Sequence, residues 1–266
     1  MKIDLYATCW NEERMLPFFF NHYDKLVDHY YIYDNQSTDG SLGILSSHPN
    51  VTILPFVLEG DSLIEAAYKK LNDIWRTSIG NADWVTICNI DELFWHPNLY
   101  KYLTRCNKKG ITYLISEGYQ MITKEFPNKD VELTKKIITG ARDKKFDKPS
   151  FFNPNKITHS GFTMARHSAI PKGCIILPKE NEILLLHYKY LGLDYVKKRH
   201  AELNARRRKN DVAKNYGHQY DAEQTIELYK NYSAMAKKVI PNITSIIWRN
   251  LLGPRPVKYS SGRKIC

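Results

Sequence analysis

Short apolar segments rich in β-branched residues recur through the first third of the chain, and amphipathic segments separate them. The apolar runs have the length and composition of buried strands, and they lie at 3–9, 27–33, 51–55 and within 83–94. Apolar side chains repeat at helical spacing over 11–27 and 61–79. Strands that alternate with helical crossovers pair in parallel, so this order predicts an α/β fold with a mostly parallel sheet.

The fourth apolar run, within 83–94, ends abruptly in two carboxylates, Asp91 and Glu92. Ligands bind at the carboxyl ends of the strands in open α/β sheets, and paired acids at such a place suit a hard cation such as Mg²⁺ or Mn²⁺. The alternative is structural, with Asp91 as a helix cap and Glu92 in the first turn of that helix.

Polar residues also follow the first two predicted strands. Asn11 has the side chain of a helix N-cap, and Glu12 suits the first turn of the helix expected over 11–27. The second strand runs into turn-forming residues that include Asp34 and Asp39. Carboxyl ends of parallel strands meet at one edge of a sheet, so we expect these side chains to converge with Asp91 in a nucleotide-binding crevice.

Two common phosphate-binding sequences are missing. No Gly-x-Gly-x-x-Gly follows the first strand, and no Walker A sequence occurs. The phosphates of a nucleotide would then be held in another way, and a metal ion at Asp91 is the available device.

The middle of the chain is less regular. A short helix is expected at 97–107 and a strand at 111–116 that ends at Glu117. Residues 120–156 are charged and contain three prolines, which predicts a long, partly mobile segment near the site. Short strands are then expected at 157–165, 174–178 and 183–188, and the last contains His187 near its end.

The composition changes after Gly192, where basic residues dominate. A basic surface helix is expected over 194–214, a second helix over 221–238, a short third helix over 243–252 and a basic tail over 254–266. The pattern therefore predicts two domains, an α/β domain at 1–190 and a helical C-terminal extension at 191–266.

Composition and charge narrow the class of protein. Of the 266 residues, 43% are hydrophobic and 25% charged, which is typical of a soluble globular chain. The net charge of +11 favours anionic partners such as nucleotide phosphates, an anionic membrane surface or nucleic acid.

Five cysteines without paired spacing predict neither a disulfide framework nor a zinc site. No signal-peptide pattern occurs and no run approaches about 20 apolar residues, so we expect a reduced, cytoplasmic protein.

Three motifs resemble those of the family 2-type glycosyltransferases. They are Thr8-Cys9-Trp10-Asn11-Glu12, the stretch from Tyr33 to Gly40, and the stretch from Asp83 through Asn89-Ile90-Asp91-Glu92-Leu93. The closer resemblance is to the bacterial branch whose metal motif reads aspartate-x-aspartate-glutamate-phenylalanine. It covers residues 1 to about 100 clearly and continues in order to His187-Tyr188.

This resemblance implies a GT-A fold and transfer of a sugar from a nucleoside diphosphate donor, with Mn²⁺ or Mg²⁺ as cofactor. It implies that Asn11, Glu12 and Asp34 border the base pocket and that Asp39 lies near the base or ribose. Asp91 would hold the metal against the diphosphate, and the family's stereochemistry implies inversion.

One position departs from the family pattern. Asn89 stands where the first aspartate of the metal motif usually stands, and an amide oxygen binds a hard cation without adding charge. Asn89 is therefore placed with the nucleotide-binding residues, and Glu92 is the acid that would compensate. A late histidine completes the metal site in several GT-A enzymes, and His187 is the matching candidate; the alternative is a hydrogen-bonded structural histidine.

The implied sugar transfer also needs a base for the acceptor hydroxyl and positive charges close to the leaving diphosphate. An inverting transfer requires a group that takes the proton of the acceptor hydroxyl, and Glu117 is the first candidate, with Asp143 and Glu182 as alternatives. The cations Arg142, Lys145 and Lys148 are expected to close over the diphosphate.

Three functions remain open at this stage. The first is a metal-dependent glycosyltransferase acting on a glycan or lipid-linked acceptor, with the basic helix 194–214 on an anionic membrane at the inner face. The second is a sugar-nucleotide-binding relic marked by Asn89. The third is a nucleic-acid-binding protein, which no recognised motif supports, so nucleic acid is not expected as a partner.

Overall fold

The computed structural model describes residues 1–240. Its main sheet begins with four parallel strands in the order β3 (Val51–Pro55), β2 (His29–Asp34), β1 (Ile3–Cys9) and β4 (Trp84–Asn89). Four further strands continue the sheet beyond β4, each antiparallel to its neighbour: β8 (Pro149–Phe152), β6 (Tyr113–Thr123), β7 (Thr139–Arg142) and β12 (Lys237–Lys238). β11 (Ile183–Leu191) runs parallel to β6 and antiparallel to β5 (Glu92–Trp95). The predicted α/β class, with parallel strands in its N-terminal half, is confirmed.

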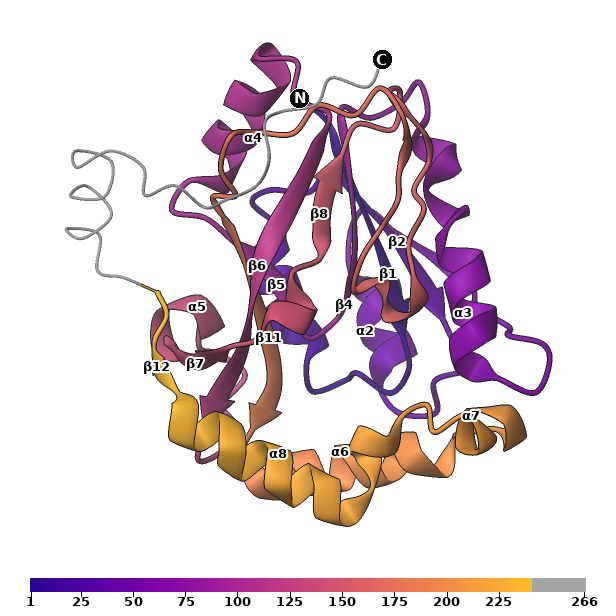
Figure 1. Ribbon diagram of the computed structural model, residues 1–266, viewed down its shortest axis with the longest axis vertical. Coiled ribbons are helices and arrows are strands. Elements are labelled where there is room, and N and C mark those ends of the chain that lie inside the picture. The colour runs from indigo at the N-terminus through magenta and orange to yellow at the C-terminus, as the bar shows by residue number, and fades with distance from the viewer. Residues whose placement is uncertain (241–266) are drawn as a thin grey trace.

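Helices cover both faces of this sheet (Figure 1). They are α1 (Leu16–Tyr23), α2 (Ser41–Ser47), α3 (Leu63–Leu71), α4 (Leu99–Lys108), α5 (Leu133–Lys136), α6 (Leu193–Ala205), α7 (Lys209–Ala213) and α8 (Ala222–Met235). Short 3₁₀ turns are η1 (Ile74–Ser78), η2 (Lys144–Phe146), η3 (Met164–Arg166) and η4 (His218–Tyr220), and β9 (Ile157–His159) forms a small hairpin with β10 (Lys172–Gly173).

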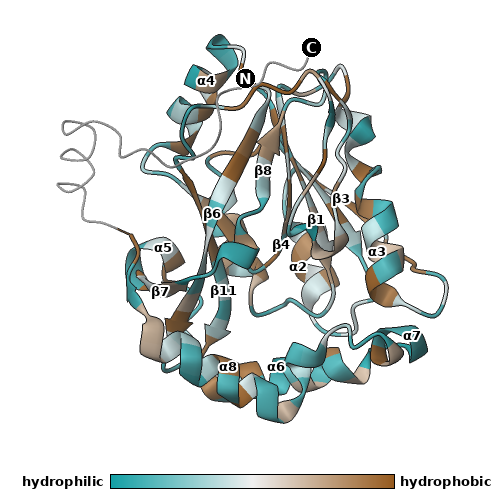
Figure 2. Cartoon of the chain, in the orientation of Figure 1, coloured by the Kyte–Doolittle hydropathy of each residue, from teal (hydrophilic) through white to brown (hydrophobic). Residues whose placement is uncertain are grey.

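The core is divided between the two faces. Buried aromatic residues of α1, including Phe19 and Tyr23, belong to one apolar cluster, and Trp75 of η1 belongs to the other. Figure 2 shows hydrophobic residues along the strands and hydrophilic residues over much of α6 and α7. Apolar burial on both faces accounts for the uninterrupted apolar runs of β1 and β4 in the sequence.

The last three helices lie across the carboxyl ends of the strands, at the lower end of the sheet in Figure 1. The change of direction occurs at Gly192, which has φ +88° and whose missing Cβ would lie 3.0 Å from the backbone of Glu125. Only glycine fits there without strain. His200 of α6 then bonds to Thr225 of α8 at 2.8 Å, so the two helices form one layer over the strand ends.

Several predicted elements differ from the structure. The helix expected over 11–27 is confined to Leu16–Tyr23, because Asn11 adopts φ +51° and bonds to the next turn instead of capping a helix. The helix expected over 61–79 stops at Leu71, where the Asn72 side chain accepts from Phe162 N at 2.8 Å, and η1 follows.

The stretch 120–156, predicted as a long and partly mobile segment near the site, contains regular secondary structure. The segment holds α5, β7, η2 and β8, and two of its strands pair with β6. The basic helix expected over 194–214 is two helices, α6 and α7. The helix and tail expected at 243–252 and 254–266 lie outside the described residues.

Three cysteines, Cys9, Cys88 and Cys106, are buried free thiols, as expected for a reduced chain. Cys174 is disulfide-bonded, which corrects that expectation for this residue. Among residues 1–240, no helix has both the length and the apolar character needed to cross a membrane.

Asp211 of α7 anchors the C-terminal layer to the sheet domain. The carboxylate is buried and accepts hydrogen bonds from Ser62 Oγ (2.5 Å), Leu63 N (3.0 Å) and Arg208 N (3.0 Å).

We predict that Asp211→Ala lowers the free energy of unfolding by about 2–3 kcal/mol, because these donors lose a charged acceptor. Urea denaturation measures the change, and the exposed Asp130→Ala serves as the control. Equal stabilities of the two variants would contradict this anchoring role.

Candidate functional site

Two turns at the carboxyl ends of β1 and β2 interlock. Cys9 lies opposite Asp34 in the sheet register, so the turns after both strands start side by side. Asn11 accepts from Thr38 N at 2.7 Å, and both oxygens of Asp39 accept backbone N–H groups of Glu13 and Ser41. Asn11 and Asp39 therefore hold the two turns together.

Asp34 has a different environment. One carboxylate oxygen accepts from Ser37 N at 3.1 Å, whereas the other is buried and has no hydrogen-bond partner within the described part of the chain. Buried polar atoms without a partner are rare, so this oxygen is available to accept a hydrogen bond from a ligand.

Asp91 and His187 meet at the carboxyl end of β4. His187 Nε2 lies 3.2 Å from Asp91 Oδ2, and its Nδ1 lies 2.8 Å from Gln120 Oε1. Because an amide oxygen only accepts, Nδ1 carries the proton and Nε2 faces the carboxylate. A carboxylate oxygen and an unprotonated ring nitrogen at this distance repel each other unless a proton or a metal cation lies between them. Burial acts to raise the pKa of Asp91, but the charge and hydrogen bond of His187 outweigh it and hold that pKa below its usual value.

Gln120 belongs to a longer chain of hydrogen bonds. Its Nε2 donates to Asp143 Oδ2 at 3.1 Å, and the Tyr232 hydroxyl of α8 donates to the same oxygen at 2.7 Å. The ring of Phe146 stacks on His187 with centroids 4.6 Å apart. These contacts fix the orientation and tautomer of His187, as the hydrogen-bond partners of metal-binding histidines do.

Glu92 is adjacent to Asp91 but points into a separate, buried cluster. Its carboxylate is fully buried and accepts from Lys148 Nζ (2.6 Å) and Arg166 Nη2 (2.8 Å). Asn89 N also donates to it at 3.1 Å. Burial acts to raise the pKa of Glu92, but the two cations dominate and hold that pKa well below its usual value. Glu92 lies opposite His187 in the register of β5 and β11, but its hydrogen bonds go to Lys148, Arg166 and Asn89.

The loop that delivers Arg166 is strained. Ala165 and Arg166 are consecutive non-glycine residues in the left-handed region, with φ +54° and +57°. Each costs roughly 1–2 kcal/mol. The Arg166 guanidinium bonds to Ile87 O as well as to Glu92, and these contacts offset the strain.

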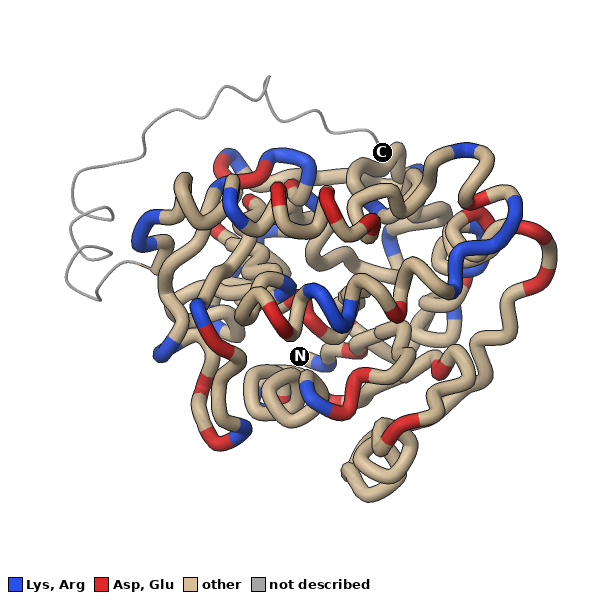
Figure 3. Tube along the Cα trace, turned by 90° about the horizontal axis from the view of Figure 1, so that it is seen from below, with Lys and Arg blue, Asp and Glu red and all other residues tan. Residues whose placement is uncertain are grey.

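Arginines of the C-terminal layer reach back to the strand ends. Arg199 of α6 donates to Glu12 Oε1 (2.5 Å) and Trp10 O (2.8 Å). Arg206 lies over the Trp10 ring, 3.8 Å from its centroid, and bonds to Asn35 Oδ1. Arg208 donates to the carbonyls of Leu58 and Gly60. Seen from the side of these helices, both basic and acidic residues lie along the layer (Figure 3).

Glu12 lies between this layer and Asp91. Its side chain is 14% exposed, and burial raises its pKa to about 7 against the pull of Arg199. Asp91 and Asp39 are the neighbouring negative charges that raise it further. Glu12, Asp91 and His187 therefore lie close enough at the strand edge for their charges to interact. Arg199 is the cation next to them.

The structure separates the other predicted residues. Glu117 is three residues from Gln120 in β6, so it points to the opposite face of that strand, near Arg142. Arg142 pairs with Asp147 at 2.7 Å, Lys148 is buried against Glu92, and Lys145 is exposed in η2. Arg142, Lys145 and Lys148 thus do not converge as a phosphate-binding cluster.

Of the two alternative bases, only one adjoins the site. Glu182 pairs with Arg105 of α4 at 2.9 Å, at the other end of the sheet, whereas Asp143 bonds to Gln120. The residues missed from the sequence are Gln120, Arg166, Arg199 and Arg206. The basic composition of 194–214 was the only sequence signal for Arg199 and Arg206, and it did not show which way their side chains face.

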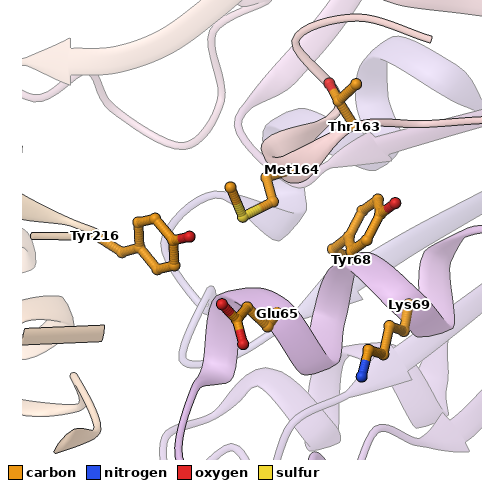
Figure 4. A pocket seen from close by; sticks show the side chains of 6 residues that line it. All are labelled: Glu65, Tyr68, Lys69, Thr163, Met164 and Tyr216. Carbon is orange, nitrogen blue, oxygen red and sulfur yellow. The ribbon is translucent and has the colours of Figure 1, made fainter. Parts of the chain in front are cut away.

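A separate cavity of about 400 Å³ lies beside α3 and is lined by Glu65, Tyr68, Lys69, Thr163, Met164 and Tyr216. Figure 4 shows Tyr216 and Met164 facing Glu65 across it. None of the strand-edge residues described above lines this cavity.

Comparison with known proteins gives structural neighbours only. No family model and no curated protein sequence matches the chain. Similar solved structures include S. aureus TarS 1–349 with UDP-GlcNAc, at 9% identity and a TM-score of 0.40 over 77% of this chain and 66% of that chain. TarS 1–349 with UDP matches at 13% identity and a TM-score of 0.40, over 58% of this chain and 47% of that chain.

Another neighbour is glucosyl-3-phosphoglycerate synthase from Mycobacterium tuberculosis with Mn²⁺, UDP and glucosyl-3-phosphoglycerate. The identity is 16% and the TM-score 0.31, over 45% of this chain and 44% of that chain. The chain thus spans less than half the length of several of the structures that it matches. At these TM-scores, the geometry of the site has to carry any conclusion about activity.

We predict that Glu92→Gln lowers the free energy of unfolding by about 3–5 kcal/mol, because Lys148 and Arg166 would remain buried without their counter-charge. Urea denaturation at neutral pH measures the loss, with the exposed Glu59→Gln as the control. A loss below about 1 kcal/mol would show that the cluster is not a stabilising ion-pair network.

Proposed function

We propose that the chain is a glycosyltransferase that transfers a sugar from a nucleoside diphosphate donor to a glycan or lipid-linked acceptor. The observation that carries the proposal is the Asp91–His187 pair at the carboxyl end of β4, beside the interlocked turns of β1 and β2. The three motifs that resemble the family 2-type glycosyltransferases all lie at these adjoining strand ends.

Two side chains at the strand edge would serve as ligands of a divalent metal in this proposal. Asp91 and His187 would hold Mn²⁺ or Mg²⁺, with Gln120 fixing the histidine tautomer. Within residues 1–240 no third acidic, histidine or cysteine ligand joins them, so diphosphate oxygens and water would fill the remaining positions, as is usual for these ions. When bound, the ion supplies Lewis-acid stabilisation of the leaving diphosphate.

The chain's own residues have separable roles in this proposal. Trp10 and the buried, unpartnered oxygen of Asp34 would form the base side of the pocket, together with Glu12 and Asn11. Asn89 would contact the nucleotide near β4, while Glu92 holds the β4–β5 turn in place. Among the acids considered for the base, Asp143 is preferred over Glu117 and Glu182, because it alone is linked to His187 through Gln120.

A lipid-linked acceptor would place the protein at the inner face of a membrane. The arginines of the predicted basic helix turn inward, so Lys197, Lys198 and Lys209, which are exposed, would supply the membrane-facing charge. Inversion of configuration is proposed from the family resemblance.

The test is release of nucleoside diphosphate from a panel of nucleotide sugars, with and without Mn²⁺ and with candidate acceptors. We predict Mn²⁺-stimulated release that falls at least about 100-fold in Asp91→Asn, because one ligand of the charge-stabilising ion is lost. In Gln120→Leu the release of nucleoside diphosphate should fall about 10- to 100-fold, because the hydrogen bond that orients His187 is removed.

The exposed Asp130→Asn is the matched control and should keep wild-type activity. Thermal unfolding of each variant establishes that it is folded. No release from any donor, or equal activity of Asp91→Asn and wild type, would refute the proposal, and binding of a nucleotide sugar without turnover would favour the relic.

A further inference from the structure

Arg199 is held at the strand edge with part of its guanidinium unused. Its side chain is 12% exposed, and Nη2 bonds to Glu12 and to Trp10 O. Nη1 is buried and makes no hydrogen bond within residues 1–240; its contact is a 3.5 Å ion pair with Glu202. A buried guanidinium with an unused donor fits an anionic ligand that would use it.

The charges around Arg199 point to the same ligand. Glu12 and Asp91 are its acidic neighbours, and Asp91 is the residue that would hold the metal against the diphosphate of the proposed donor. A diphosphate next to two carboxylates requires compensating cations besides a metal. The cations predicted from the sequence do not meet this need, since Lys148 is buried against Glu92 and Arg142 pairs with Asp147.

The neighbouring arginines differ in position. Arg206 lies over Trp10 and near Asp34, on the base side, and Arg208 is bound to the carbonyls of Leu58 and Gly60. Burial and the charges of Arg199 and Arg208 lower the pKa of Arg206 to about 10. The three guanidiniums therefore crowd together, and Arg199 is the member whose charge interacts with Asp91.

We propose that Arg199 of α6 binds the diphosphate of the donor nucleotide, with Glu12 holding the guanidinium in place. This inference rests on the proposed function and specifies which part of the chain recognises the phosphates. The C-terminal helical layer is then part of the donor site, and the planar fork of arginine suits two phosphate oxygens.

The test is calorimetric binding of UDP, GDP, ADP and CDP, each compared with its nucleoside, to the full chain with Mn²⁺. For the nucleotide that binds wild type, we expect Arg199→Gln to weaken diphosphate binding about 10- to 100-fold. Nucleoside binding should stay within about twofold. Arg199→Lys keeps the charge and should lose less than the glutamine variant. Lys230→Gln removes the same charge from an exposed position of α8 and should bind like wild type.

The outcomes separate this inference from the proposed function. Wild-type affinity for the diphosphate in Arg199→Gln overturns the inference and leaves the proposed function standing. Equal losses for diphosphate and nucleoside also overturn it, because Arg199 would then only shape the pocket. If no nucleoside diphosphate binds to wild type, both proposals fall.

Discussion

The buried carboxylate of Glu92 is the contact on which the site depends. It joins the β4–β5 turn to Lys148 at the edge of β8 and to Arg166 in η3, three segments that are distant in the sequence. Desolvating these charges is costly, and only their mutual pairing compensates for it. The pairing also explains why two consecutive residues tolerate left-handed backbone angles. Because Asp91 is the neighbour of Glu92, the cluster fixes where the carboxylate of Asp91 stands relative to His187.

The strand edge is completed by elements from the far end of the chain. α6 contributes Arg199 and Arg206 to the side of β1 and β2, and α8 contributes Tyr232 to the hydrogen bonds that orient His187. β12 then pairs with β7 in the same sheet. The segment after Gly192 thus contacts the strand edge on the side of β1 and β2 and on the side of His187, and in the proposed glycosyltransferase it would help to recognise the donor.

The fold was largely predictable, because apolar runs of strand length and turn residues are local signals. β1 and β3 were predicted at their observed limits, and the positions of Asn11, Asp34 and Asp91 at neighbouring strand ends follow from parallel pairing.

The roles of Glu92 and Lys148 were not predictable, because spacing shows that an acid is near a strand end but not which cation it meets. Arg166 lies 74 residues from Glu92, and only tertiary structure brings them together. The arginines of α6 were misread as outward-facing, since hydropathy cannot distinguish a solvated cation from one that points at a crevice.

In the proposed function, the carboxyl edge of β1, β2 and β4, covered by α6, binds the diphosphate of the donor nucleotide. Crystals grown with Mn²⁺ and the nucleoside diphosphate that binds best, measured at the manganese absorption edge, test this directly. We expect an anomalous peak next to Asp91 and His187, with the nucleotide extending from there toward Trp10. A nucleotide bound elsewhere, for example in the cavity beside α3, or a manganese peak away from Asp91, would contradict it.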